Sequence, residues 1–224
     1  MKDIIYEPEH PEGLTETQER LALSLFDSGV FLFDFENGFR LKHHEKYPNA
    51  PLSPFYINLR LLQSHPETAK LEAVTSLIEL SDGLEFNRIT AVPRAADPLV
   101  SSMADRTGWS QITPRTENKD HGLEVGIDGV YEPGDTVLVV DDLITTAASK
   151  LEMIKVLKSK GLVVRDVVVV FDREQGGEQE LAEKGYNLHA ALEIKPTLQY
   201  YSRVGRITQE QLVKVLAYLE NPLG

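Results

Sequence analysis

The segment from Leu162 to Asp172, LVVRDVVVVFD, constrains the fold more than any other part of this chain. It is rich in valine, and most of its apolar residues follow one another without alternating with polar ones. A strand of this kind is expected to be buried on both faces, because a strand with one face in water alternates apolar and polar side chains. Such strands are typical of parallel sheets covered by helices on both sides. The segment therefore predicts an α/β fold.

The sequence around this segment alternates expected strands with expected helices. Strands are predicted over residues 88–93, 110–113, 135–141 and 187–194, and helices over residues 95–108, 146–161 and 177–185. Strands that alternate with helices of about 10–15 residues indicate βαβ units and a parallel sheet. Residues 114–134 carry charges and glycines without a clear period, so a long loop or loose hairpin is expected there.

The N-terminal part of the chain is expected to add a small subdomain. A helix over residues 14–30 starts with a capping box of Thr15 and Gln18. Strands over residues 30–35 and 38–42 are expected to pair around a turn at Asn37–Gly38. A loop over residues 43–53 and a strand over residues 54–60 follow.

The rest of the chain completes a single predicted domain over residues 1–224. A helix over residues 64–83 is expected to start with Ser64 and Glu67 as its capping box, and two helices finish the chain. The predicted parts are an N-terminal hood segment (about 14–60), a core (about 64–195) and C-terminal helices (about 196–220).

Composition limits the classes of function. The formal net charge is −12, which argues against nucleic acid as a main partner, because proteins that bind it usually carry a basic surface. The chain has no cysteine, so disulfides and thiolate metal sites are excluded. The N-terminus lacks the apolar core of a signal peptide, and no run approaches the roughly 20 apolar residues of a membrane span. We expect a soluble cytoplasmic protein with no membrane partner.

Two adjacent aspartates, Asp141 and Asp142, end the strand predicted over residues 135–141. Ligands of open α/β sheets bind beyond the carboxyl ends of the strands. The carboxylates suit hydroxyl groups or a hydrated Mg²⁺, and the N–H groups of the helix that follows suit a phosphate. A sugar phosphate has both parts. The alternative is an acidic helix cap, which explains one aspartate but not two adjacent like charges.

The residues after the pair fit the same interpretation. Thr145, Thr146 and Ser149 offer hydroxyl donors, and the small side chains of Ala147 and Ala148 let the backbone approach a phosphate closely. The segment contains no G-x-x-x-x-G-K pattern, so a nucleoside-triphosphate loop of the Walker type is not indicated.

The segment VLVVDDLITTAAS resembles the phosphoribosyl-diphosphate (PRPP) signature of type I phosphoribosyltransferases. Further segments narrow the resemblance to the orotate phosphoribosyltransferase family. RTENKDHG (Arg115–Gly122) resembles the flexible catalytic loop of that family, and FDREQGG (Phe171–Gly177) resembles its D-R-x-x-G segment. GFRLK followed by SPFYINLR resembles its N-terminal substrate segment, and the C-terminal helices have its usual form. The resemblance covers about residues 15 to 220.

The resemblance implies a Rossmann-like parallel sheet flanked by helices, with a small N-terminal hood and a flexible catalytic loop. It implies transfer of ribose 5-phosphate from PRPP to N1 of orotate, with Mg²⁺ on the released pyrophosphate. By this analogy Asp141 and Asp142 are catalytic residues that hold the ribose hydroxyls or Mg²⁺-bound water. Residues 145–149 form the 5′-phosphate turn, and Thr145 also contacts the base.

Other matched residues are expected to bind the two substrates. Arg115, Lys119 and His121 match loop cations that cover the pyrophosphate, the last two with a catalytic role. In the family this loop, residues 114–130 here, reaches the neighbouring subunit's site, which implies a homodimer. Arg173 matches the residue that binds the orotate carboxylate, where a guanidinium fork fits. Pro93 to Ala96 match a loop beside the pyrophosphate, and the base-side segment contributes Lys42, Tyr56 and Ile57.

The chain departs from the family pattern at three places. Thr116 stands where the loop usually has a second cation, and Arg94 is our candidate to replace that charge. Ala147 stands where the phosphate turn usually has glycine, which requires a negative φ there. Residues 43–52 enlarge the loop after Lys42.

Two alternatives stay open beside an orotate transferase. The first is a transferase for another base, against which Arg173 argues because a neutral purine gives a guanidinium nothing to neutralise. The second is a non-catalytic PRPP-sensing regulator on the same fold. Regulators of that kind usually carry a DNA-binding domain and a basic face, and the sequence shows neither.

Overall fold

The structure is a computed structural model that describes residues 13–115 and 126–222. It divides into two compact units. One unit comprises Leu59–Glu193, and the other combines the residues up to Asn58 with those from Ile194 onward. The expected core segment lies in the first unit, and the expected hood segment and C-terminal helices share the second. None of the helices in the described ranges combines the length and apolar character that a membrane crossing needs.

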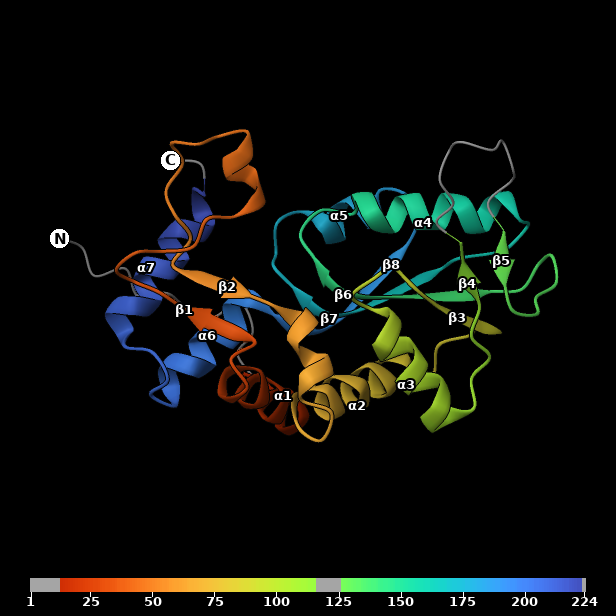
Figure 1. Ribbon diagram of the computed structural model, residues 1–224, viewed down its shortest axis with the longest axis horizontal. Helices are drawn as coiled ribbons and strands as arrows, with labels where there is room; N and C mark the ends of the chain where they lie inside the picture. Colours follow the sequence, from red (N-terminus) through yellow and green to blue (C-terminus); the bar gives the residue numbers. More distant parts are fainter. Residues whose placement is uncertain (1–12, 116–125, 223–224) are drawn as a thin grey trace. The chain divides into compact units, whose positions relative to one another are not determined.

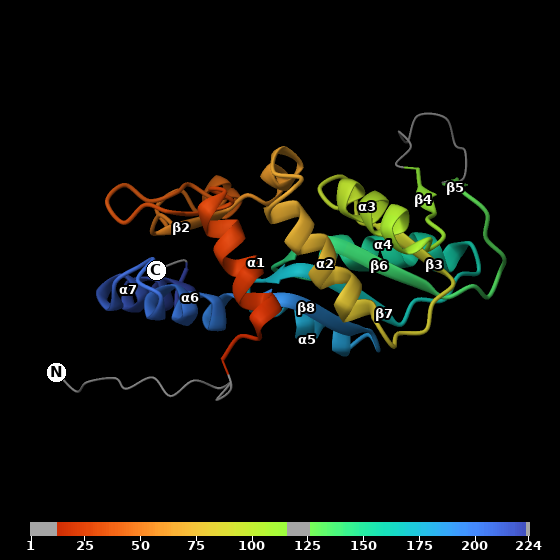
Figure 2. The same ribbon diagram turned by 90° about the horizontal axis from the view of Figure 1, so that it is seen from below.

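The Leu59–Glu193 unit is built on a parallel sheet of four strands in the order β3-β6-β7-β8. The strands are β3 (Arg88–Ala91), β6 (Val137–Ile144), β7 (Asp166–Asp172) and β8 (Asn187–Glu193). Helices α2 (Ala69–Ser81) and α3 (Asp97–Thr107) cover one face, and α4 (Ala148–Ser159) and α5 (Gly177–Ala182) cover the other (Figure 1, Figure 2). The predicted α/β class and parallel sheet are confirmed.

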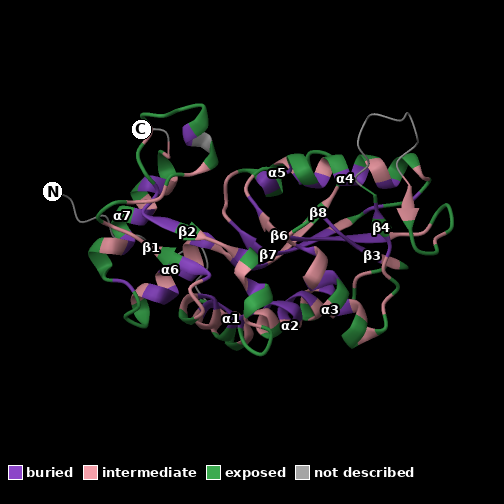
Figure 3. Ribbon diagram, in the orientation of Figure 1, coloured by how far each residue is buried: buried purple, intermediate pink, exposed green. Residues whose placement is uncertain are grey.

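Strand β7 confirms the reason for that prediction over part of the segment, because the strand begins at Asp166 and not at Leu162, and Val163 and Arg165 before it are exposed. Its residues from Val167 to Asp172 are all buried, and the strands of this sheet form the buried centre of the unit (Figure 3). Valine, with its branched β-carbon, fits a pleated surface that packs against helices on both sides.

Strand β6 is longer than predicted. It was expected to end at Asp141, but it pairs with β7 as far as Ile144, which lies opposite Asp172. The acidic pair therefore lies inside the strand, because the ladder with β7 continues past the point where the apolar pattern stops.

The predicted loose hairpin is confirmed within the described residues. Strands β4 (Thr113–Pro114) and β5 (Ile127–Asp128) pair antiparallel. The strand expected over residues 110–113 is wrong in position, since Gln111 makes only an isolated bridge with Ile89.

The second unit has a two-stranded antiparallel sheet of β1 (Phe31–Phe33) and β2 (Phe55–Ile57). Around it lie α1 (Glu16–Asp27), α6 (Ile194–Arg203) and α7 (Gln209–Glu220). Its core is aromatic: Phe31 stacks on Phe33 and Phe55, and the Tyr201 ring meets Phe31 edge to face. The buried Tyr201 hydroxyl donates a 2.7 Å hydrogen bond to the Ala22 carbonyl.

The predicted hairpin around Asn37–Gly38 is wrong. Gly38 does have the positive φ of a turn, 69°, and Asp34 accepts hydrogen bonds from the N–H groups of Glu36 and Asn37. Strand β1 nevertheless pairs with β2, and Phe39 makes only an isolated bridge with Ser53. Lys42–Glu45, at the border of the expected strand and loop, is a 3₁₀ helix, η1.

One of the two predicted capping boxes near the N-terminus is confirmed. Thr15 and Gln18 cap α1 with both reciprocal hydrogen bonds. Ser64 and Glu67 do not cap α2, because Ser64 ends a 3₁₀ helix, η2 (Leu59–Ser64), and α2 begins only after Thr68.

Candidate functional site

The end of β6 and the start of α4 form the centre of the candidate site. The acidic pair lies on β6, residues 145–147 form the turn, and α4 begins at Ala148. Asp141 is buried and Asp142 is partly exposed. In the turn and the first turn of α4, Thr146, Ala148 and Ser149 are exposed, where a ligand could reach them.

A buried lysine lies beneath this turn. The Lys150 side chain reaches back from α4, and its Nζ lies 2.7 Å from Oδ2 of Asp141. The other oxygen of Asp141, Oδ1, accepts the Asp142 N–H at 2.8 Å. Both carboxylate oxygens of Asp141 therefore contact the chain itself. This differs from the expectation that both aspartates face the substrate, and it leaves Asp142 as the member of the pair with solvent access.

Burial raises the pKa of the Asp141 carboxyl to about 7, while the Lys150 ammonium opposes that rise and the charge of Asp142 adds to it. The motifs of the sequence did not point to Lys150. A signal was present, because Lys150 shares the buried face of α4 with Met153, Ile154 and Leu157. A lysine at a helix position that should be apolar, shortly after two aspartates, indicates a buried ion pair.

Ala147 satisfies the condition set by its departure from the family pattern. Its φ is −81° and its ψ is 0°, a right-handed conformation that alanine adopts without strain. It is buried and forms the N-cap of α4, without a side-chain cap. Its N–H donates a 2.8 Å hydrogen bond to Oε2 of Glu180, a residue of α5 that the sequence analysis did not single out. A carboxylate of the chain thus occupies one amide of the predicted phosphate turn.

The segment that follows β7 lies against the same strand end. The Arg173 N–H donates a 3.0 Å hydrogen bond to the Ile144 carbonyl. Gly177 packs so closely that a Cβ there would lie 2.5 Å from Ile144 Cγ1. The backbone of Arg173 therefore lies beside the end of β6, close to the acidic pair and the phosphate turn, and the contact of its guanidinium with orotate stays a prediction.

Asp172 adds a pH-dependent group beside this site. The residue is 4% exposed. Burial raises its pKa to about 6, helped by the charges of Glu174, Glu193 and Glu178, although the Glu174 N–H donates to it at 2.8 Å and lowers it.

Replacing Asp172 by asparagine is expected to stabilise the protein at pH 8 and not at pH 4. The folded state holds the Asp172 proton more tightly than the unfolded chain, whose pKa is near 3.8. The free energy of unfolding therefore falls as the pH rises from about 4 to about 6 and stays low above it. Asparagine keeps the acceptor for Glu174 and carries no charge, so Tm should rise by about 3 °C at pH 8. Calorimetry at both pH values checks this, and an equal gain at pH 4 would contradict it.

Arg94 lies at the same end of the parallel strands as the acidic pair, namely their carboxyl end. It follows β3, whose continuation at Val92 donates its N–H to the Val140 carbonyl of β6 at 2.8 Å. The peptide bond between Pro93 and Arg94 is cis, and the Arg94 side chain is exposed. Burial raises the pKa of the neighbouring Asp97, and the charge of Arg94 lowers it. An exposed cation is therefore present beside β6, where a charge to replace the one missing at Thr116 was expected.

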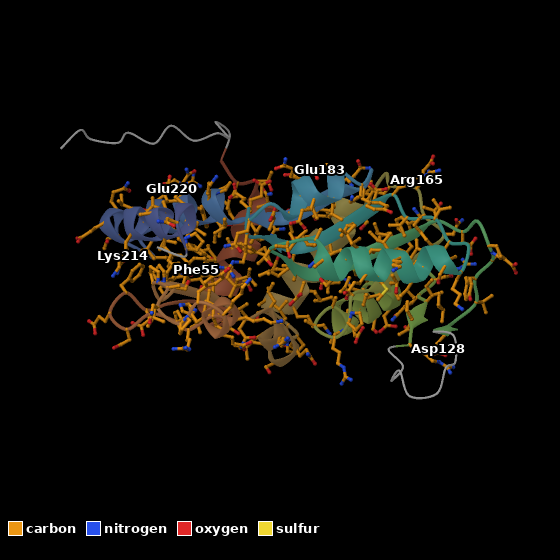
Figure 4. All side chains as sticks on the ribbon, turned by 90° about the horizontal axis from the view of Figure 1, so that it is seen from above. Phe55, Asp128, Arg165, Glu183, Lys214 and Glu220 are labelled. Atoms are coloured by element: carbon orange, nitrogen blue, oxygen red, sulfur yellow. The ribbon has the colours of Figure 1, made fainter. Side chains whose placement is uncertain are left out.

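Arg115 lies on the β4–β5 hairpin, in an exposed ion pair. Its Nε and Nη2 lie 2.8 Å and 2.5 Å from Oδ1 of Asp128, which Figure 4 labels. The Arg115 N–H also bonds the Gly126 carbonyl at 2.8 Å. An exposed pair exchanges easily for another anion, because water competes with it. Lys119 and His121, with Thr116, lie outside the described residues.

The residues expected on the base side belong to the other unit. Lys42 begins η1 and is exposed, Tyr56 is exposed on β2, and Ile57 ends β2 partly buried. Their contact with a base stays a prediction. His44, by contrast, is buried, and its ring nitrogens lie within hydrogen-bond distance of Leu41 and Pro51, as expected for a structural histidine.

The described residues contain no group of three or more histidines and acids that could hold a metal ion. The donor set fits a Mg²⁺ ion that takes only one ligand from the acidic pair. Asp141 contacts Lys150 and its own backbone, so Asp142 is the member of the pair that could reach an ion. Such a site suits Mg²⁺ that takes most of its ligands from water and substrate oxygens.

Known structures define the class of this protein. It superposes on the UMP synthase of Leishmania donovani with a TM-score of 0.76 and 32% identity, over 91% of this chain and 42% of that one. It superposes on the orotate phosphoribosyltransferase of Aeropyrum pernix with a TM-score of 0.69 and 26% identity, over 84% and 99%. These similarities, together with an acidic pair near the end of a parallel strand that leads into a helix, place the protein in the phosphoribosyltransferase class.

Curated relatives define the family, although no protein-family model matches the chain. The chain is 31% identical to an orotate phosphoribosyltransferase of Caenorhabditis elegans, over 78% of this chain and 77% of the relative. It is 31% identical to that of Coxiella burnetii, over 81% and 89%. The chain belongs to the orotate phosphoribosyltransferase family. It spans 40% of the length of a Caenorhabditis elegans uridine 5′-monophosphate synthase, to which it is 32% identical.

Proposed function

We propose that this protein transfers the ribose 5-phosphate of PRPP to N1 of orotate, giving orotidine 5′-monophosphate and pyrophosphate in pyrimidine biosynthesis. The observation that carries the proposal is the convergence of three groups at one strand end. Asp142 is a partly exposed carboxylate, the start of α4 offers N–H groups to a phosphate, and Arg173 is tied to the same strand through Ile144.

The reaction forms the bond between N1 of orotate and C1 of the ribose, breaks the bond between C1 and the pyrophosphate oxygen, and releases the proton of N1, which pyrophosphate or water accepts. The electrons of the broken bond leave with the pyrophosphate, so positive charge grows on the ribose. The Asp142 carboxylate is the group proposed to face that charge, and fixed charges of this kind are a large contribution to catalysis. The amides at the start of α4 and the hydroxyls of Thr145, Thr146 and Ser149 bind the 5′-phosphate.

Arg173 and Asp142 also bind the base and the leaving group: Arg173 binds orotate, and Asp142 binds the Mg²⁺ ion on the pyrophosphate. The guanidinium of Arg173 accommodates the carboxylate of orotate in a bidentate manner. Asp142 is the residue proposed to hold Mg²⁺, directly or through water, and the bound ion would neutralise charge on the pyrophosphate.

We also propose a homodimer in which loop 114–130 covers the neighbouring site. In that arrangement Arg115 leaves its ion pair with Asp128 and binds the pyrophosphate. Light scattering tests the dimer.

One assay tests the activity. The protein is mixed with PRPP, Mg²⁺ and orotate, and the loss of orotate absorbance is followed. Turnover with orotate supports the proposal, and turnover only with another base would assign a different transferase. PRPP binding by calorimetry without any turnover would assign a PRPP-sensing regulator instead.

Replacing Arg94 by alanine is expected to raise KM for PRPP and Kd for pyrophosphate about tenfold, because a hydrogen-bonded cation is removed from the leaving group. KM for orotate should not change. The matched control is Arg165→Ala, which removes the same charge just before the start of β7, whereas Arg94 follows the end of the parallel strand β3; Figure 4 labels Arg165. Steady-state kinetics and pyrophosphate calorimetry check both variants. Unchanged constants for Arg94→Ala would show that Arg94 does not replace the charge missing at Thr116.

A further inference from the structure

We propose that Lys150 is a positioning residue for the transfer: its buried ammonium holds Asp141 inside the fold and fixes the β6–α4 turn, so that Asp142 alone faces the substrate. This inference rests on the proposed function, because it assigns Lys150 a task in the same site. Lys150 itself does not touch the substrate.

The three donors of the ammonium connect three parts of the site. Nζ lies 2.7 Å from Oδ2 of Asp141. It donates to the Leu143 carbonyl at 2.5 Å and to the Ser149 hydroxyl at 3.5 Å. These acceptors belong to the acidic pair, to the strand end that leads into the turn, and to the first turn of α4. An ammonium has three N–H donors, so each donor has an acceptor. One side chain thus fixes both sides of the predicted phosphate turn.

The burial of this ion pair makes its geometry rigid. Lys150 is 3% exposed and Asp141 is 5% exposed. A buried charge is strongly unfavourable unless it is paired and hydrogen-bonded, so neither side chain can rotate away from the other at small cost. The ion pair also explains why Asp141 and Asp142 can be adjacent, because Lys150 neutralises the charge of Asp141.

The pair also sets the direction of the second carboxylate. The Asp142 N–H donates to Oδ1 of Asp141 at 2.8 Å, so the backbone that carries Asp142 is oriented by the carboxylate that Lys150 holds. The ammonium in addition places a positive charge beneath the turn proposed for the 5′-phosphate. In a chain with a formal net charge of −12, a cation close to an anion site counts for more than a distant one, because the interaction falls with distance.

A purely structural pair predicts a different result from a positioning pair. Buried ion pairs replaced by uncharged residues of similar volume often leave stability unchanged or improved. The double variant Asp141→Asn/Lys150→Met removes both charges, keeps both volumes and avoids an unpaired buried charge. If Lys150 serves stability alone, this variant is as active as the parent once it is folded.

The experiment compares the parent, Lys150→Met, the double variant and the control Lys155→Met, which removes a lysine from an exposed position of the same helix. Steady-state kinetics give kcat and the two KM values, calorimetry gives the affinity for PRPP with Mg²⁺, and thermal unfolding gives Tm. For the double variant we expect a Tm within a few degrees of the parent. Its kcat/KM for PRPP should be about tenfold to hundredfold lower, with an unchanged KM for orotate. Lys155→Met should match the parent.

The outcomes separate this inference from the proposed function. A parent that turns over, with a folded double variant of parental kinetic constants, overturns the role of Lys150 and leaves the activity intact. A parent that binds PRPP without transfer contradicts the activity; loss of PRPP affinity in the double variant then still supports the positioning role, and unchanged affinity overturns it. A parent that neither transfers nor binds PRPP overturns both. If Lys150→Met does not fold, the double variant decides.

Discussion

Replacing Asp142 by asparagine is expected to lower kcat about a hundredfold to a thousandfold, the usual cost of removing a preorganised charge from a transition state. KM for PRPP should change less than about threefold, because the positive charge on the ribose develops only as the bond to pyrophosphate breaks. Asparagine has nearly the same shape as aspartate and keeps an oxygen that accepts hydrogen bonds. The substitution therefore removes charge at the strand end and little else. Stopped-flow and steady-state measurements with PRPP and orotate separate the two constants.

The control for this variant is Asp105→Asn, which removes the same charge from an exposed position on α3. Its kinetic constants should equal those of the parent. If Asp142→Asn raises KM for PRPP as much as it lowers kcat/KM and leaves kcat unchanged, Asp142 binds the ground state, and the role given to it here is wrong.

Replacing Gly177 by alanine is expected to destabilise the protein by about 1–3 kcal/mol, the usual range for overpacking a core. The new Cβ would lie 2.5 Å and 2.6 Å from Cγ1 and Cδ1 of Ile144 and 3.0 Å from the Thr145 carbonyl oxygen. Alanine is favoured over glycine in a helix by up to about 1 kcal/mol. The contact with Ile144 outweighs that gain, because Ile144 is fully buried and Thr145 contributes backbone, so neither moves without moving the turn.

The same variant should also weaken PRPP binding, since the displaced backbone belongs to the proposed phosphate turn. Thermal unfolding and PRPP calorimetry measure the two effects. Gly126→Ala is the control for stability: its Cβ would meet the Arg115 side chain at 3.7 Å, an ordinary contact. A Gly177→Ala variant as stable as the parent would show that α5 moves away from the turn without cost.

The parts of the fold that could be predicted from sequence are those with a strong local signal. The valine run of β7 indicates burial on both faces wherever the strand pairs, and Thr15 with Gln18 caps a helix through contacts three residues apart. The partner of β1 could not be predicted in this way. A turn does form near Gly38, but pairing of β1 with β2 depends on an aromatic core completed by Tyr201, far along the chain. The end of β6 likewise depends on the length of β7.

The residues of the candidate site also divide into those that could be predicted from sequence and those that could not. Asp142 and Arg173 could be named because each belongs to a short recognisable segment, and the strand ends bring both to one edge of the sheet. The sequence signals Lys150 only as a lysine on the apolar face of a helix, and it gives no signal for Glu180, because the importance of both residues depends on which atoms they reach. The Lys150 ammonium bonds a residue nine positions earlier, and Glu180 reaches the Ala147 amide from another helix. Contacts of this kind follow from helix packing, which sequence patterns describe only as an apolar face.

The division of the chain into two units has a consequence for how the protein is made. The unit with the parallel sheet is one uninterrupted stretch, Leu59–Glu193, whereas the other is assembled from residues on both sides of that stretch. During synthesis, every strand of the parallel sheet is translated before α6 and α7. The side chains of Phe31 and Phe55 therefore stay exposed to solvent and to chaperones until Tyr201 and Tyr218 are translated and pack against them. Nascent chains that end at Glu193 and are joined to a linker long enough to span the ribosomal exit tunnel should therefore resist protease over the sheet while α1 and β1 are still cleaved.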